Sequence, residues 1–293
     1  MRKMKNLSGP LTIVFLYFII PLNLQAQNFV PGDKLMSELI SDTSFRISTN
    51  VKETHVRYLN KAGKPMAIYI LEARLKKNKL SMEATSPFNK DTFAMQTVRR
   101  QMKWENGPKH QVLAGVNADF FNMKTGVPTT MSIKEGKALR DTILSGRYFV
   151  GVKKNGKIII GDSALYERKK NKLQEALGGF PLLVKNGHVI PQSSNKFSTT
   201  RHPRTALGIV NKRTVIFVVV DGRQPDYSNG MPLEELAILM KSLGARTALN
   251  LDGGGSSTLV SIEDNGDGWE VRNRPSGSRQ RAVANAWIIV NEQ

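Results

Sequence analysis

The sequence of 293 residues predicts an α+β fold, with a mixed β-sheet core, helices packed on it and active-site loops at strand ends. Short runs rich in β-branched and aromatic residues recur along the chain, whereas helical periods are few. Two pairs, Asn155-Gly156 and Asn186-Gly187, separate such runs, which is typical of β-hairpin turns. Leu233, Leu236 and Met240 recur at helical spacing and indicate one amphipathic helix.

The first residues are typical of a secretory signal peptide. Arg2, Lys3 and Lys5 precede an apolar run over 11–24, and Leu24-Gln25-Ala26 resembles a cleavage site. We expect cleavage after residue 26, export to the periplasm or the medium, and no later membrane span; an uncleaved anchor is the alternative. The chain has no cysteine, which excludes a lipoprotein anchor and a disulfide framework.

The chain is strongly basic. Removal of the first 26 residues subtracts three of the 43 basic residues and none of the 24 acidic ones, which leaves a net charge of +16. Such an excess favours anionic partners, namely glycans, phosphate-bearing substrates, membrane surfaces or nucleic acid. Export argues against nucleic acid. The basic runs at 74–79 and 168–172 are predicted to be solvated faces rather than binding sites.

The first half of the chain is predicted to consist mainly of strands. Residues 27–53 form an expected leader with a short helix at 35–40, and one domain covers 54–293. Inside it we predict strands at 55–59, 66–74 and 80–84, a helix at 93–104 and a buried strand at 111–116.

The second half is predicted to alternate hairpins, strands and one helix. The predicted elements are hairpins at 149–160 and 182–190, a short helix at 173–177, strands at 204–210, 215–220, 246–251, 259–262 and 282–290, and a helix at 233–243. The acidic segment at 263–268 faintly suggests a calcium loop, but Arg274 stands where the closing glutamate belongs, so a hairpin turn is the preferred interpretation.

One stretch predicts a functional site. Asp252 is followed by Gly253, Gly254 and Gly255, and then by Ser256 and Ser257. Adjacent glycines cost conformational entropy on folding, so we expect them where side chains would obstruct something. Such a loop can offer several backbone N–H groups to one anion. The alternative is a tight strand-to-strand turn, for which two glycines would be enough.

Three polar clusters follow apolar strands, beginning at Asn117, Asp221 and Asp252. If these strands are neighbours in one sheet, the clusters meet at one edge, where loops carry function. Phe120 and Phe121 lie in the first cluster; we expect one in the core and the other, assigned as Phe121, to form an apolar wall for a sugar ring.

Six short motifs stand in a fixed order from about residue 91 to the end. They are Asn117-Ala118-Asp119-Phe120-Phe121, Gly178-Gly179-Phe180-Pro181-Leu182-Leu183-Val184, Arg204-Thr205-Ala206-Leu207-Gly208, Asp221-Gly222-Arg223, Asn250-Leu251-Asp252-Gly253-Gly254-Gly255-Ser256-Ser257-Thr258 and Arg281-Ala282-Val283-Ala284-Asn285. Together they resemble the phosphodiester glycosidase family, which also occurs in many exported bacterial proteins. That family often has a small residue at the position of Asp119.

The resemblance implies hydrolysis of a small sugar-1-phosphodiester or phosphoglycan, with release of free sugar and with no cofactor or metal. A phosphate monoester is a good leaving group, so the reaction mainly needs a carboxylate at the sugar and cations and N–H donors at the phosphate. The implied catalytic set is Asp252, Asp221, Asn117 and Asp119. The implied binding set is Arg204, Arg281, Arg223, Asn285, Phe121, Ser256, Ser257 and the three glycines. For each arginine alone, the alternative is a surface ion pair.

Other chemistries fit less well. The glycine loop lacks the Gly-Lys-Ser/Thr ending of a nucleotide-binding loop, and Ser256 is not in a Gly-x-Ser-x-Gly elbow. The four histidines show no metal-ligand spacing. The rival hypothesis is a non-catalytic module that binds anionic cell-envelope or extracellular glycans through the same basic cleft. The sequence leaves the oligomeric state open.

Overall fold

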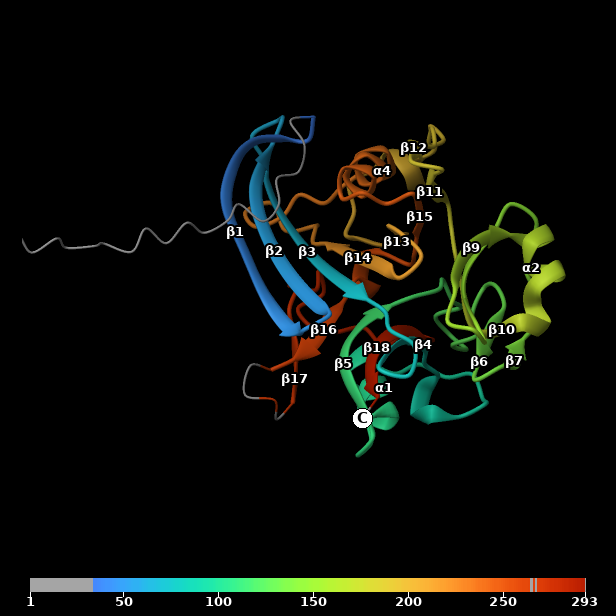
Figure 1. Ribbon diagram of the computed structural model, residues 1–293. Helices are drawn as coiled ribbons and strands as arrows, with labels where there is room; N and C mark the ends of the chain where they lie inside the picture. The colour runs from blue at the N-terminus through green and yellow to red at the C-terminus, as the bar shows by residue number, and fades with distance from the viewer. Residues whose placement is uncertain (1–33, 264–265, 267, 293) are drawn as a thin grey trace, which may run out of the picture.

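The computed structural model describes residues 34–263, 266 and 268–292 (Figure 1). Three β-sheets dominate the fold, and each pairing between their strands is antiparallel. The predicted combination of sheet and packed helices is correct in part, since strands predominate over helices, and the single mixed sheet is wrong. The predicted signal peptide lies outside the described residues. No helix in the described part of the chain is long and apolar enough to cross a membrane.

The largest sheet has eight strands and carries the helix predicted at 233–243. Across the sheet these are β1 (Met36–Ser48), β2 (Val51–Asn60), β3 (Pro65–Arg74), β14 (Thr214–Val220), β13 (Arg204–Ile209), β15 (Thr247–Asn250), β11 (Leu182–Lys185) and β12 (His188–Val189). Every residue of β14 is buried, as its run of β-branched residues predicted. Helix α4 (Leu233–Ser242) packs its apolar side against this sheet.

Two five-stranded sheets complete the fold (Figure 1). One consists of β7 (Lys137–Arg140), β6 (Ser132–Lys134), β10 (Leu173–Gly179), β8 (Tyr148–Lys153) and β9 (Ile158–Asp162). The other consists of β17 (Trp269–Val271), β16 (Leu259–Ile262), β5 (His110–Asn117), β18 (Ala286–Glu292) and β4 (Leu80–Ala84). The remaining helices are short: α1 (Val98–Glu105), α2 (Ser163–Lys169) and α3 (Lys196–Thr199).

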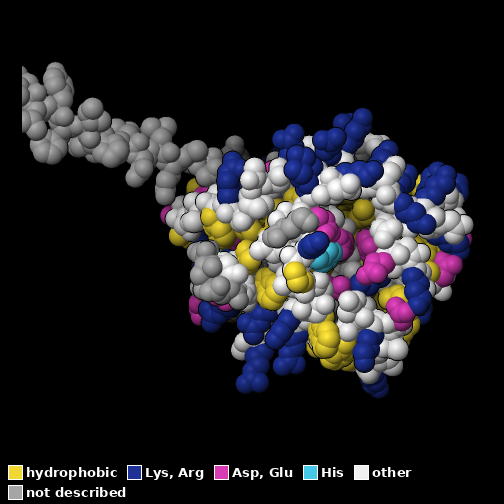
Figure 2. All heavy atoms as spheres, turned by 60° about the horizontal axis from the view of Figure 1, so that its bottom comes forward, with side chains coloured by type: hydrophobic (Ala, Val, Ile, Leu, Met, Phe, Trp, Pro, Cys, Tyr) yellow, Lys and Arg dark blue, Asp and Glu magenta, His cyan; other side chains and the backbone are white. Residues whose placement is uncertain are grey.

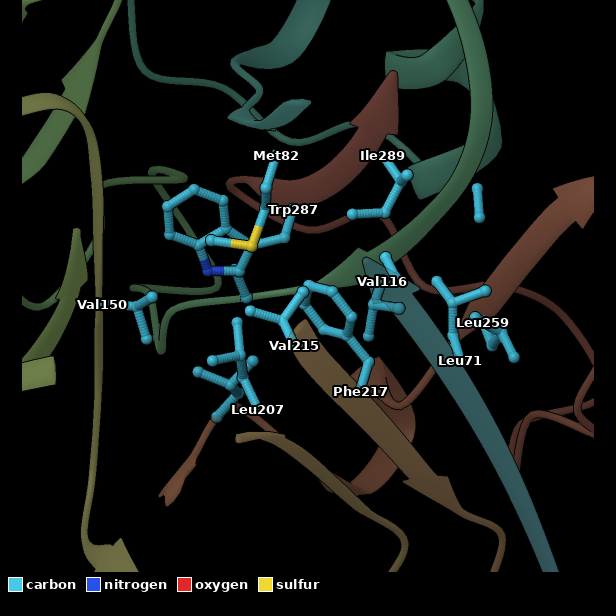
Figure 3. Close-up of a cluster of buried hydrophobic side chains, with 14 of the residues drawn as sticks. Leu71, Met82, Val116, Val150, Leu207, Val215, Phe217, Leu259, Trp287 and Ile289 are labelled. Atoms are coloured by element: carbon cyan, nitrogen blue, oxygen red, sulfur yellow. The ribbon is translucent and has the colours of Figure 1, made fainter. Parts of the chain in front are cut away.

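The main hydrophobic core joins all three sheets (Figure 3). Phe217 of the eight-stranded sheet, Trp287 of β18 and Val150 of β8 belong to the same buried cluster. Because the three sheets bury apolar side chains in this shared cluster, they stabilise one another.

Two predicted helices are wrong, and both errors have the same cause. Residues 36–40 belong to β1 and residues 173–177 to β10 instead, and Leu35 lies in the turn before β1. Leu173 and Leu177, four residues apart, are both buried, which imitates a helical period. Register shifts in both strands break the alternation of side chains that marks a regular strand. Both predicted hairpins are confirmed, and so is the β16–β17 hairpin.

The N-terminal segment is continuous with the large sheet. Strand β1 pairs with β2 along its whole length, and residue 54, the predicted start of the domain, falls inside β2. The predicted helix at 93–104 begins only at Val98, because Gln96 instead forms a β-bridge with Val283.

Candidate active site

The glycine loop lies where two sheets meet. It follows β15 of the eight-stranded sheet and leads into β16 of a five-stranded sheet. The backbone N–H of Asp252 donates to the carbonyl oxygen of Ala118 at 2.8 Å, and that of Gly254 donates to Pro203 at 2.9 Å. The polar clusters at Asn117 and Asp252 therefore converge as predicted, although their strands belong to different sheets.

Asn117 is the buried connection between these elements. Its Nδ2 donates to the carbonyl oxygen of Asp252 at 2.6 Å. Its Oδ1 accepts from Thr205 Oγ1 at 2.9 Å and from the backbone N–H of Thr258 at 3.0 Å. These side-chain contacts are all internal to the protein, so the geometry gives this predicted catalytic residue a positioning role.

The glycines of the loop make room for other protein groups. A Cβ on Gly253 would lie 2.8 Å from the carbonyl oxygen of Pro203. One on Gly254 would lie 3.2 Å from Arg223 Nη2, and one on Gly255 would lie 2.6 Å from Arg281 Cζ. Contacts this short are not tolerated by real Cβ atoms without movement. Two guanidinium groups thus lie directly against the loop.

These two arginines form the cationic part of the site. Arg223 is exposed and Arg281 is partly exposed, and neither forms a salt bridge with any residue that the structure describes. Arg223 Nη2 lies 3.3 Å from Nδ1 of His202, whose pKa is lowered by burial and by the neighbouring cations Arg223 and Arg204. Guanidinium groups without acidic partners are well suited to bind a phosphate.

Asp252 is the carboxylate nearest to this charge. Burial raises its pKa to about 6, against the lowering effects of Ser256, of the Gly253 N–H and of the Arg281 charge. The Gly253 N–H donates to Asp252 Oδ1 at 2.9 Å. The Ser256 hydroxyl acts on this carboxyl although its Oγ makes no hydrogen bond of standard geometry.

Asp119 is a second carboxyl close behind the loop. Its Oδ2 accepts from Thr130 Oγ1 at 2.7 Å and from the Thr130 N–H at 3.2 Å. Burial, with a smaller contribution from the negative charge of Asp252, raises its pKa to about 7. A Cβ on Gly178 would lie 2.8 Å from Thr130 Cβ and 2.9 Å from Asp119 Oδ1, which explains why this motif needs glycine.

Asp221 lies deeper, and both of its carboxylate oxygens are occupied. Asn273 Nδ2 donates to Oδ1 and the Arg274 N–H donates to Oδ2, both at 2.7 Å. Asn273 Nδ2 also donates to the Ser257 carbonyl oxygen at 3.1 Å. Burial raises the pKa of Asp221 to about 6. Its position supports the glycine loop through Asn273, so we assign it to structure rather than to the reacting centre.

Arg204 is also turned toward the protein. It is buried, and its Nε donates to the Met231 carbonyl oxygen at 2.9 Å. Its Nη2 donates to the carbonyl oxygens of Phe197 and Thr200 at 2.8 and 2.9 Å. Because Nε and Nη2 both donate to these carbonyl oxygens, Arg204 cannot offer two adjacent N–H donors to a phosphate. The bidentate phosphate contact predicted from the sequence is therefore absent from the role of Arg204.

Several buried polar atoms around the loop lack a hydrogen-bond partner among the described residues. Asn285 Oδ1 accepts from the Asp119 N–H at 2.9 Å, but its Nδ2 has no partner. The same holds for Ser257 Oγ, Thr258 Oγ1 and Asn250 Oδ1. Unpaired buried polar atoms are rare and call for an explanation, and a functional site is one.

The two neighbouring phenylalanines have exchanged roles relative to the prediction. Phe121 packs against the apolar cluster that contains Val98 and Met102 of α1. Phe120 instead lies 6.1 Å from the ring of Phe197, which stacks on Phe180 at the same centroid distance. We call these three rings the aromatic wall.

The aromatic wall lies next to the glycine loop, and an arginine packs against two of its rings. Phe180 accepts a 2.6 Å hydrogen bond from Asn250 Nδ2, and Phe120 directly follows Asp119. The Arg147 guanidinium lies 4.7 Å from the Phe180 ring centroid and 5.8 Å from that of Phe120. Arg147, Thr130 and Phe197 could not be predicted from the six motifs because they stand outside them, whereas Phe180 stands within one.

The fold also brings together three side chains of the types that bind metal ions. The spacing of the histidines in the sequence did not predict this group. Glu83, His110 and Glu292 lie on adjacent strands, with ligand atoms within 4.8 Å of one another. His110 Nε2 lies 3.1 Å from Glu83, and its Nδ1 lies 3.0 Å from Glu292. Both ring nitrogens of His110 therefore face carboxylates within the protein.

Comparisons with known proteins identify the family of the chain. Residues 110–290 match the family model described as phosphodiester glycosidase. The N-acetylglucosamine-1-phosphodiester alpha-N-acetylglucosaminidases of Mus musculus and Bos taurus are each 26% identical over 160 residues, which is 49% of this chain and 31% and 30% of the relatives. The matched region thus spans about a third of the length of these curated relatives.

Solved structures share the fold. The zebrafish N-acetylglucosamine-1-phosphodiester alpha-N-acetylglucosaminidase catalytic domain, auto-inhibited by its pro-peptide, has a TM-score of 0.65 at 21% identity over 86% of this chain and 88% of that one. A hypothetical protein from Synechocystis has a TM-score of 0.63 at 14% identity, covering 86% of this chain and 64% of that one. A putative exported protein from Burkholderia pseudomallei has a TM-score of 0.54 at 16% identity, covering 78% of this chain and 74% of that one.

Proposed function

Since the family model covers more than half of it, the chain belongs to the phosphodiester glycosidase family, and we propose that it hydrolyses a sugar-1-phosphodiester. The bond broken is that between the anomeric carbon and its oxygen, and the products are the free sugar and a phosphomonoester. The family resemblance that the sequence motifs indicated is confirmed.

One observation carries this proposal. The Asp252 carboxyl and the guanidinium groups of Arg223 and Arg281 surround one glycine loop, and the arginines lack acidic partners among the described residues. A phosphodiester held by the two cations presents its neighbouring anomeric carbon to the carboxylate. The carboxylate stabilises positive charge at that carbon while the cations stabilise the departing phosphate.

The carboxyls of Asp252 and Asp119 have different roles because their environments differ. Asp252, whose pKa burial raises to about 6, is mainly ionised at pH 7 and faces the arginines. Asp119, whose pKa burial raises to about 7, keeps a proton more readily and is enclosed by Thr130. The two groups titrate as a pair, because ionisation of one disfavours ionisation of the other. We assign Asp252 to the reacting centre. We assign to Asp119 the role of influencing the protonation state of Asp252.

The aromatic wall supplies the sugar side of the site. Phe120 and Phe180 are partly exposed and Phe197 is exposed, next to Asp119 and Asn250. An aromatic face is suited to the C–H face of a pyranose. The names of the curated relatives make N-acetylglucosamine the first sugar to test.

The test compares two substrates and one variant. The protein should release free sugar from an N-acetylglucosamine-1-phosphodiester and leave the matching alkyl glycoside intact, because the glycoside lacks the phosphate leaving group. Asp252→Asn is nearly isosteric and should abolish turnover while substrate affinity stays within about threefold. A non-catalytic glycan-binding module, the rival hypothesis, would bind the phosphodiester without turnover even at high protein concentration.

We also propose that the protein is exported. The basic start, the apolar run over 11–24 and Leu24-Gln25-Ala26 support this, and the segment lies outside the described residues. Sequencing of the native N-terminus should find a chain that begins near Gln27; one that still begins at Met1 contradicts the proposal.

A further inference from the structure

A large hollow lies away from the glycine loop. It has a volume of about 990 Å³ and is lined by the β3–β4, β8–β9 and β13–β14 turns. A second hollow of about 580 Å³ shares Lys157, Lys212 and Arg213 with it. Because the two share these lining residues, they form one extended depression, which we call the basic groove.

The basic groove is distinct from the candidate active site. His110, at the start of β5, lines the groove, whereas Asn117, at the end of β5, holds Asp252. Likewise Arg213 precedes β14 and Asp221 follows it. A strand rises about 3.3 Å per residue, so roughly 20 Å separates the two sites at opposite ends of the same strands.

Each of the three turns contributes at least two cations to the groove. They are Lys76 and Lys77 from β3–β4, Lys153 and Lys154 from β8–β9, and Lys212 and Arg213 from β13–β14. In the part of the chain that the structure describes, none of the six forms a salt bridge. Lys and Arg side chains also gather in several groups around one face of the molecule (Figure 2). The basic groove differs from a surface group of cations because its cations surround a hollow.

The acidic residues that line the groove do not offset these cations. Glu83 faces His110 at 3.1 Å, and Glu135 pairs with Lys134 at 2.6 Å. Glu175 accepts from the backbone N–H groups of Ala84 and Glu135 at 3.3 and 3.1 Å, and burial raises its pKa to about 8. The groove is therefore strongly positive at neutral pH.

We propose that the basic groove binds an anionic polysaccharide, a carbohydrate chain that carries phosphate, sulfate or carboxylate groups. Its extended form suits a polymer better than a single small anion. A flat membrane surface does not reach into a hollow. Single-stranded nucleic acid stacks its bases on aromatic side chains, and the described residues that line the groove include no Phe, Tyr or Trp. Leu75, Leu80 and Val152 add apolar contacts for sugar rings.

The experiment measures binding of a fluorescent heparin decasaccharide, with neutral dextran, a single-stranded DNA 20-mer and phosphatidylserine vesicles as comparison ligands. The groove variant is Lys153→Gln/Lys154→Gln/Lys212→Gln. The matched control, Lys61→Gln/Lys64→Gln/Lys241→Gln, removes the same charge from exposed lysines that do not line the groove. Thermal unfolding confirms that both variants are folded.

We expect the groove variant to lose about tenfold in heparin affinity and to show a shallower salt dependence, while the control changes by less than about twofold. Release of sugar from a small phosphodiester should be unchanged in both variants, so the outcome is independent of the proposed hydrolysis. Equal losses in both variants would show binding by net charge alone and overturn the proposal. So would tighter groove-dependent binding of DNA or vesicles, or heparin binding no tighter than that of dextran.

Discussion

Gly255→Ala tests whether the glycine loop exists to accommodate Arg281. The new Cβ would lie 2.6 Å from Arg281 Cζ and 3.0 Å from its Nε, so the guanidinium must move. Gly255 itself has no positive φ angle, so alanine fits its backbone without strain. The substitution therefore displaces a cation and leaves the loop conformation in place.

The expected loss follows from the contact that Arg281 makes. A hydrogen bond to a charged group contributes about 1.5–3 kcal/mol, so displacing the guanidinium from the phosphate should lower kcat/KM roughly 10- to 150-fold. The melting temperature should stay within about 3 °C of wild type, because alanine also reduces the entropy of the unfolded chain. Gly107→Ala is the matched control, since its Cβ would meet nothing within 4 Å.

The assay is a double-mutant cycle with Gly255→Ala, Arg281→Ala and the combined variant. If the alanine acts only by displacing Arg281, it costs nothing further once Arg281 is gone. If Gly255→Ala lowers kcat/KM as much in the Arg281→Ala background as in wild type, the reasoning is refuted. The glycine would then serve close approach of the ligand itself, as the sequence analysis assumed.

Two further predictions concern residues behind the loop. Arg204→Ala removes three hydrogen bonds to backbone carbonyls and should lower the free energy of unfolding by about 2–4 kcal/mol, measured by urea denaturation; a selective loss of phosphodiester affinity at unchanged stability would contradict this. Because the pKa of Asp119 is raised to about 7, the folded state holds its proton more tightly than the unfolded state, so the contribution of Asp119 to stability is greatest below about pH 4 and is lost as the pH rises to about 7. Asp119→Asn keeps an acceptor for Thr130 and should flatten the slope of stability against pH between 4 and 8; an unchanged slope would show that Asp119 isn't its source.

The convergence of the polar clusters could be predicted from sequence, because each follows a buried strand. The run over 215–220 and the helix with Leu233 and Leu236 were strong local patterns, and the fold preserves both. Register shifts in β1 and β10 were not predictable, because they depend on the partner strands rather than on local spacing.

The roles of individual charged residues were harder to predict. Arg204 turns inward because Phe197 and Met231, from other segments, offer carbonyl oxygens to it. The carboxylate of Asp221 accepts a hydrogen bond from Asn273, which lies in none of the recognised motifs. Which of two neighbouring phenylalanines faces the core depends on where α1 packs. Sequence reasoning thus located the site, whereas the direction of each side chain required the three-dimensional contacts.

Hydrolysis in water enriched in oxygen-18 tests the central claim most directly, because the position of the label identifies the bond that breaks. Cleavage between the anomeric carbon and oxygen puts the water oxygen into the sugar, and the phosphomonoester contains none of it. Cleavage at phosphorus puts the label into the phosphate, whose oxygens do not exchange under the assay conditions. We predict an unlabelled phosphomonoester, detected by mass spectrometry and by the phosphorus NMR shift. A labelled phosphomonoester would contradict a glycosidase mechanism and assign the site to phosphodiester hydrolysis at phosphorus.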